Sequence, residues 1–212
     1  MEKIEIPEAL LGEVVASKER IQSTVKRVAK EIFYSIDYVG QIPILLCLKD
    51  GAIPFHRDLA RELENLSFQF ENAWLKTHHR YDGVDGTGNV KVFPYEGPDL
   101  DGRLVVIVED IIDSSETIVR VCEYLDSKNV AQRNICAFLF KERPENMEWR
   151  NTGLNGYKHL PEVRHMGLFI QPLFVVGYGL DYRQFGRIGE EIRVLTPEGQ
   201  VWVDEQIGKL LD

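Results

Sequence analysis

The stretch that decides the fold is Val105-Val106-Ile107-Val108-Glu109-Asp110-Ile111-Ile112-Asp113, which leads into the turn Ser114-Ser115-Glu116-Thr117. An apolar run enters two adjacent carboxylates, and a third carboxylate follows two more apolar residues. Because an unpaired buried charge is costly, a buried strand that ends in three acids indicates a site that uses them. The turn opens a predicted helix, whose free backbone N–H groups favour a phosphate. We therefore expect a phosphorylated sugar, with the acids serving its hydroxyls and a bound metal ion.

Apolar runs and amphipathic segments alternate on both sides of this stretch. Helices are expected over 17–38, 54–65 and 116–126, and strands over 43–48, 68–76, 90–94, 104–108, 135–140 and 174–178. A loop is expected over 77–89, irregular structure over 142–165, and a turn over 196–199 ahead of Val201-Trp202-Val203 and a short terminal helix. The βαβ alternation predicts a mostly parallel α/β sheet with right-handed crossovers. Such sheets bind ligands beyond the carboxyl ends of their strands, where Lys49-Asp50-Gly51, the 109–117 segment and Lys141 all fall.

Composition limits the function classes. The chain has 212 residues, 44% hydrophobic and 28% charged, as in one soluble globular domain. Its net charge of −9 disfavours a nucleic-acid binder or a protein of anionic membranes. No apolar run is long enough to span a membrane, and the N-terminus lacks a signal pattern. Three widely spaced cysteines in apolar surroundings indicate reduced thiols, so we expect a cytoplasmic protein without a disulfide framework.

The 105–117 stretch resembles the phosphoribosyl-pyrophosphate (PRPP) motif of type I phosphoribosyltransferases, and four further blocks narrow the resemblance to the hypoxanthine-guanine phosphoribosyltransferases. Leu48-Lys49-Asp50-Gly51 is similar to the pyrophosphate loop, and Leu75-Lys76-Thr77 with Gly88-Asn89-Val90-Lys91-Val92 to the mobile catalytic loop and its return strand. Phe140-Lys141 and Phe174-Val175-Val176-Gly177-Tyr178-Gly179-Leu180-Asp181-Tyr182 resemble the purine-binding hood. These matches stand in family order over roughly 44–196.

The resemblance implies the type I phosphoribosyltransferase fold: a mostly parallel twisted sheet flanked by helices, with a small purine-binding hood from the chain ends and a mobile loop. It further implies a single domain over 1–212, with its core over about 38–172 and its hood from about 1–16 and 173–212. A homodimer or homotetramer is expected on the same ground.

The implied reaction transfers the 5-phosphoribosyl group of PRPP to hypoxanthine or guanine, giving IMP or GMP and pyrophosphate, with Mg²⁺ as cofactor. By resemblance Asp113 is the general base, Glu109 and Asp110 hold the ribose hydroxyls and one magnesium ion, and Asp181 reaches the other. The phosphate groups are assigned to a larger set: Ser114, Ser115, Glu116 and Thr117 for the 5′-phosphate, and Lys49, Asp50, Gly51 and Arg187 for the pyrophosphate.

Purine recognition is assigned by the same resemblance. Lys141 is expected to donate to the 6-oxo group, which favours hypoxanthine and guanine over adenine, and Phe174 is expected to stack on the ring. Backbone groups near Val175 and Asp181 would accept from a guanine amino group. The loop that begins at Thr77 and His78 is expected to close over the ligands.

Three positions depart from the family pattern. Asp50 stands where the pyrophosphate loop commonly has a small residue, and a carboxylate there repels pyrophosphate unless it points away or helps a metal ion. Ser115 stands where the PRPP turn usually has glycine, which tolerates unusual dihedral angles better. Thr77-His78 replaces the usual Ser-Tyr at the closing loop.

Plainer interpretations exist for the same residues. The acids of 109–113 would each more often be a solvated strand end, Lys141 a surface lysine, Phe174 a core residue, and Asp181 with Arg187 an ordinary surface ion pair. The alternative function is a PRPP-binding regulatory protein of the same fold, with weak or no transferase activity. The acidic balance and the presence of Asp113, Lys141 and Arg187 favour the enzyme.

Overall fold

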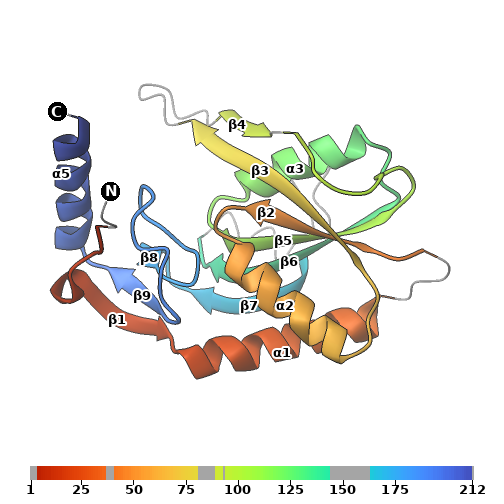
Figure 1. Cartoon of the computed structure of the whole chain (residues 1–212), viewed down its shortest axis with the longest axis horizontal. Helices are drawn as coiled ribbons and strands as arrows, with labels where there is room; N and C mark the ends of the chain where they lie inside the picture. The colour runs from red at the N-terminus through yellow and green to blue at the C-terminus, as the bar shows by residue number, and fades with distance from the viewer. Residues whose placement is uncertain (1–3, 37–40, 81–88, 93, 144–162, 212) are drawn as a thin grey trace.

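The central element is a six-stranded sheet with the order β4-β3-β2-β5-β6-β7 (Figure 1). The computed structural model describes residues 4–36, 41–80, 89–92, 94–143 and 163–211. The strands are β2 (Ile44–Lys49), β3 (Glu71–Arg80), β4 (Asn89–Val92), β5 (Leu104–Ile112), β6 (Gln132–Lys141) and β7 (Val163–Ile170). All neighbours pair in parallel except β3 and β4, which are antiparallel. This arrangement confirms the expected mostly parallel α/β sheet.

Helices cover both faces of this sheet (Figure 1). Helices α1 (Lys18–Ser35) and α2 (Ile53–Asn65) pack on one face, and α3 (Glu116–Asp126) packs on the other. The strands between them read as continuous apolar runs because both of their faces are buried. Each helix has an apolar stripe at helical spacing, as Ile21, Val25, Val28 and Ile32 show on α1.

A second, three-stranded sheet has the order β1-β9-β8 and is antiparallel. It is formed by β1 (Leu11–Ala16), β8 (Val175–Val176) and β9 (Ile192–Leu195), preceded by the 3₁₀ turn η1 (Glu8–Leu10) and followed by α5 (Pro197–Leu211). Both ends of the chain therefore meet in one small subdomain beside the main sheet (Figure 1). This is the expected hood from the chain ends.

The expected turn over 196–199 is wrong, because these residues start α5. The Thr196 hydroxyl accepts a hydrogen bond from Gly199 N at 3.0 Å, and Pro197 occupies the first helical position. A threonine cap followed by proline is a helix start, so Val201-Trp202-Val203 lies inside the helix.

Two loop boundaries also need correction. Residues 77–80 continue β3 instead of starting a loop, because they pair antiparallel with β4. β7 begins at Val163, inside the segment expected to be irregular, and it pairs in parallel with β6. Residues 81–88 of the expected loop and residues 144–162 of the expected irregular segment lie outside the described residues. Among the described residues, no helix has the length and apolar character needed to cross a membrane.

Candidate active site

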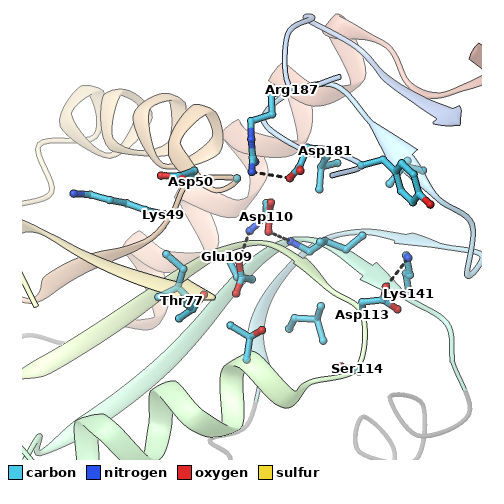
Figure 2. Close-up of a pocket in the computed structure, with 18 of the residues that line it drawn as sticks. Lys49, Asp50, Thr77, Glu109, Asp110, Asp113, Ser114, Lys141, Asp181 and Arg187 are labelled. Carbon is cyan, nitrogen blue, oxygen red and sulfur yellow. Dashed lines mark hydrogen bonds and ion pairs between the residues drawn. The ribbon is translucent and has the colours of Figure 1, made fainter. Parts of the chain in front are cut away.

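One cavity of about 820 Å³ lies between the carboxyl ends of the main-sheet strands and the hood. Its wall includes most of the predicted site residues: Lys49, Asp50, Gly51, Thr77, Glu109, Asp110, Asp113, Ser114, Ser115, Thr117, Lys141, Phe174, Val175, Asp181 and Arg187 (Figure 2). Parallel strands carry their carboxyl ends to the same edge, which is why segments far apart in sequence converge here. Glu116 is not part of the wall, and the side chain of His78 lies outside the described structure.

Glu109 and Asp110 form the floor of the cavity at the end of β5. The Glu109 carboxylate accepts a hydrogen bond from Asp110 N at 3.1 Å, and Asp110 accepts from Ile111 N at 2.7 Å. Burial and the adjacent Asp110 charge raise the pKa of Glu109 well above its usual value, and burial also raises the pKa of Asp110. A buried carboxyl group beside a partly buried one favours a ligand that supplies positive charge or hydroxyl donors.

The pyrophosphate-loop residues lie against this floor. A Cβ atom on Gly51 would stand 1.7 Å from Asp110 Oδ2, so only glycine permits this approach of loop and carboxylate. The peptide bond between Lys49 and Asp50 is cis. The Asp50 carboxylate lies 3.1 Å from Lys76 Nζ, so a lysine of β3 compensates its charge.

Lys49, the other charged residue of this loop, is directed elsewhere. Its ammonium lies 2.8 Å from Glu96 Oε2 and 5.9 Å from the centre of the Trp74 ring. Figure 2 shows the Lys49 side chain extending away from Glu109 and Asp110. A role at the pyrophosphate, which the resemblance implies, therefore requires a change of rotamer.

Asp113 has two cationic partners at the other end of the cavity. Lys141 Nζ lies 2.7 Å from Asp113 Oδ2, and Arg143 Nε hydrogen-bonds to Asp113 Oδ1. Burial disfavours the ionised carboxyl, but the bonds from Lys141 and Arg143 outweigh it and hold the pKa of Asp113 below its usual value. Sequence reasoning missed Arg143; its position two residues after Lys141, just beyond the end of a predicted strand, was the available signal.

The turn into α3 has the shape of an anion cradle. Ser115 precedes the helix with φ 60° and ψ −6°, the left-handed region that glycine adopts at least cost. The departure from glycine thus falls on a residue whose backbone conformation favours glycine. Ser114, Ser115 and Thr117 line the cavity at the N-terminus of this eleven-residue helix, where the helix dipole favours negative charge.

The hood reaches the cavity through two glycines of positive φ. Gly177 has φ +99° and Gly179 has φ +97°, and a Cβ atom on Gly179 would stand 2.1 Å from Gly51 O. The hood turn therefore rests directly on the pyrophosphate loop. Between the glycines, the buried Tyr178 hydroxyl donates to Asp58 Oδ2 on α2 at 2.9 Å.

Beyond this turn, Asp181 has two partners, an ion pair and a hydrogen bond. Arg187 NH2 lies 2.7 Å from Asp181 Oδ1, and Gln184 N donates to Oδ2 at 2.5 Å. Arg187 also donates to Gly179 O at 2.7 Å. Phe174 is 49% exposed, and Lys141 Nζ lies 5.3 Å from the centre of its ring. The ring and the ammonium thus stand together at the Asp113 end.

The cationic side chains of the wall share one property. Each has a carboxylate partner in the structure: Lys49 with Glu96, Lys76 with Asp50, Lys141 with Asp113, Arg183 with Asp204, and Arg187 with Asp181. An incoming anionic ligand must therefore exchange ion pairs instead of meeting bare cations.

Magnesium fits the floor as an ion held jointly with a ligand. In the described part of the chain, no group of three or more His, Cys, Asp or Glu side chains is arranged to hold a metal ion. Magnesium commonly uses one or two carboxylates together with phosphate oxygens and waters, and the adjacent carboxylates of Glu109 and Asp110 offer that donor type.

Residues 14–183 match the family model described as the phosphoribosyl transferase domain. The chain belongs to the phosphoribosyltransferase family. A hypoxanthine-guanine phosphoribosyltransferase of Staphylococcus aureus strain Mu50 is 30% identical over 189 residues, which are 89% of this phosphoribosyltransferase and 96% of that protein. The expected hypoxanthine-guanine type is therefore confirmed at the level of the family.

Solved structures agree with this phosphoribosyltransferase assignment. A hypoxanthine phosphoribosyltransferase of Staphylococcus aureus superposes with a TM-score of 0.73 at 27% identity, covering 90% of this chain and 94% of that one. A hypoxanthine phosphoribosyltransferase of Trypanosoma cruzi, solved with its product IMP, has a TM-score of 0.72 at 23% identity over 91% of this chain and 98% of that one. The second likeness supports the fold alone.

Proposed function

We propose that this phosphoribosyltransferase moves the 5-phosphoribosyl group of PRPP to hypoxanthine or guanine, giving IMP or GMP and pyrophosphate, in purine salvage. The observation that carries the proposal is the contact of Lys141 with Asp113, 2.7 Å apart beside Phe174, in the same cavity as Glu109 and Asp110. An acceptor and a donor thus stand together beside an aromatic face, as a 6-oxopurine requires.

PRPP would lie along the floor of the cavity. Its 5′-phosphate would take the turn of Ser114, Ser115 and Thr117, and its ribose hydroxyls would bind Glu109 and Asp110. Bound Mg²⁺ would neutralise the pyrophosphate charge, held by Glu109 and Asp110 and by Asp181 once Arg187 turns to the pyrophosphate. Arg187 offers a guanidinium fork suited to phosphate oxygens, and Lys49 would join it after a change of rotamer.

The purine would enter between Phe174 and Asp113. The ammonium of Lys141 has three donors, so it can hold Asp113 and the 6-oxo group together. As the bond from the anomeric carbon to the pyrophosphate oxygen breaks, a ring nitrogen of the purine bonds to that carbon and its proton passes to Asp113. Positioning and charge stabilisation supply most of the catalysis in such a step.

The test is incubation of the purified protein with PRPP, Mg²⁺ and hypoxanthine, guanine or adenine, with nucleotide formation followed by chromatography. IMP or GMP is expected, with adenine a poor substrate. Asp113→Asn is expected to lower kcat by about 10²–10⁴-fold with little change in PRPP affinity, because it removes the proton acceptor alone. Lys141→Ala should raise KM for the purine more than KM for PRPP.

These measurements separate an enzyme from a regulatory protein and test Lys141 and Asp113 individually. PRPP binding without turnover of any purine would reject the enzyme in favour of a regulatory PRPP-binding protein. A best rate with adenine would reject the assignment of Lys141, and an unchanged rate in Asp113→Asn would reject the role of Asp113 as the base.

We also propose the single-domain division given above, a cytoplasmic location supported by three free buried cysteines, and a homodimer or homotetramer, to be measured by sedimentation.

A further inference from the structure

Arg143 has no role in the function proposed above, yet it contacts the proposed base directly. Its Nε atom hydrogen-bonds to Asp113 Oδ1, while Lys141 holds Oδ2. The two oxygens of one carboxylate are thus divided between two cations. Arg143 does not belong to the cavity wall, so it acts on the site through Asp113.

The backbone explains why Arg143 can reach Asp113. After β6 the chain is anchored by Glu142 N, which donates to Ile170 O at 2.8 Å, and by Arg143 N, which donates to Lys141 O at 2.8 Å. The first bond holds the segment beside the end of β7, and the second closes a γ-turn centred on Glu142. The turn leaves both Lys141 and Arg143 in contact with Asp113.

Lys141 and Arg143 differ in burial and in whether they face the cavity. The Lys141 side chain is 5% exposed and faces the cavity, whereas the Arg143 side chain is 36% exposed and lies behind Asp113. If Lys141 shares its donors with a purine oxygen, its hold on Asp113 weakens. Arg143 keeps its own bond, because a ligand in the cavity does not compete for it.

We propose that Arg143 is a positioning residue: it fixes the orientation and the charge of Asp113 while Lys141 serves the purine. The inference rests on the proposed function, in which Asp113 is the base. The other charged side chains of the cavity wall are of both signs: the carboxylates of Asp50, Glu109, Asp110 and Asp181, and the cations Lys49, Lys76, Arg183 and Arg187. Arg143 and Lys141 are the two cations that keep Asp113 ionised against its burial.

The first measurement follows the carboxyl carbon of Asp113 by NMR through a pH titration of the full chain, assigned with Asp113→Asn. Arg143→Gln is expected to move the titration midpoint upward by about 1 pH unit, because one opposite charge is removed. Arg143→Lys keeps a charge and is expected to stay near the wild-type midpoint. Arg120→Gln is the matched control, since Arg120 pairs with Glu123 on the exposed side of α3, and it should leave the midpoint unchanged.

The second measurement is the pH profile of kcat/KM for hypoxanthine. Its acid limb should move upward in Arg143→Gln by the same amount as the NMR midpoint, with the lysine variant restoring it. A lower but unshifted profile would show a merely structural role and would overturn the inference. An equal shift in the lysine and glutamine variants would also overturn it, because charge would then not be the cause.

The two proposals fail in different ways. A wild-type protein that makes no nucleotide would reject the function and leave the NMR titration readable. An active enzyme whose Asp113 midpoint does not move in Arg143→Gln would reject the role of Arg143 alone.

Discussion

Ser115 has a backbone conformation that does not suit its side chain. Its φ of 60° places it in the left-handed region, in which a Cβ atom crowds the following carbonyl at a cost of about 1–2 kcal/mol. The same residue starts α3 and lines the cavity, so its conformation sets the direction of the backbone N–H groups of the turn. Strain of this kind persists where the surrounding structure fixes it.

Ser115→Gly is expected to raise the free energy of unfolding by about 0.5–1 kcal/mol, since the relief of strain exceeds the added freedom of the unfolded chain. Urea denaturation measures the change. Ser127→Gly is the matched control: Ser127 ends α3 with φ −64° and its hydroxyl donates to Tyr124 O at 2.6 Å, so glycine there should destabilise. Loss of stability in Ser115→Gly would mean that its side chain contributes more than its backbone costs.

At the scale of single residues, the sequence predicts those site residues whose placement follows from the ends of the strands alone. Asp113 and Lys141 follow buried strands, so parallel pairing brings them together. Arg143 and the partners of Lys49 were not predictable, because they depend on how the chain turns after a strand and on side-chain rotamers. The pairing of Asp50 with Lys76 likewise needed the register of β2 against β3.

The contact between two turns, one from each sheet, is the decisive feature at the scale of elements. Gly179 in the hood turn lies against Gly51 of the pyrophosphate loop, and Gly51 lies against Asp110 of β5. Three segments are thus stacked with no room for a Cβ atom at either glycine. A side chain at either glycine would push the hood turn, the Lys49-Asp50-Gly51 loop and β5 apart.

Gly179→Ala is expected to lower kcat/KM by at least tenfold and to destabilise the chain by about 2–4 kcal/mol, from left-handed strain and overpacking together. Steady-state kinetics and urea denaturation provide the two measurements. Gly102→Ala separates the causes: Gly102 has φ +67° with no atom within 4 Å of the added Cβ, so it should lose about 1–2 kcal/mol and keep its activity. Equal kinetic losses in both variants would refute the role of the close approach.

The sequence predicts the strands that are buried on both faces and the long amphipathic helices. It does not predict elements whose hydrophobic pattern is interrupted or ambiguous. β7 contains His165 and Gly167, which interrupt its apolar run, and Gly167 is required because a Cβ atom there would stand 2.1 Å from Phe138 O. At the start of α5, the sequence Thr-Pro-Glu-Gly suits both a turn and a helix start, and the hydrogen bond of Thr196 decides for the helix.

At the scale of the whole molecule, Tyr178 joins the hood to the main sheet and to α2. Tyr178 of the hood packs its ring 5.2 Å from Phe138 of β6, and its hydroxyl donates to Asp58 of α2. Asp58 also pairs with Arg57 and Arg61, so the tyrosine is bound to a small charged network. These contacts of Tyr178 hold the hood in place beside the carboxyl ends of the strands.

Tyr178→Phe is expected to lower the free energy of unfolding by about 1–2 kcal/mol, as for a lost hydrogen bond to a charged group. Asp58→Asn in a double-mutant cycle should show that the two effects are not additive. Tyr34→Phe, at an 81% exposed tyrosine of α1, is the control and should change stability by less than about 0.5 kcal/mol. Additive losses would indicate that the hydroxyl and Asp58 act separately.

The paired cations of the cavity have a consequence for the whole catalytic cycle. Under the proposed function, a protein carboxylate occupies the place of a substrate oxygen on its cation before substrate binds, as Asp181 does on Arg187 and Asp50 does on Lys76. A phosphate that took over Arg187 would release Asp181 for a metal ion, and the original pair would re-form once the pyrophosphate departed. Loading and emptying would then be exchanges of ion-pair partners, in which Arg187 has an anionic partner in both states.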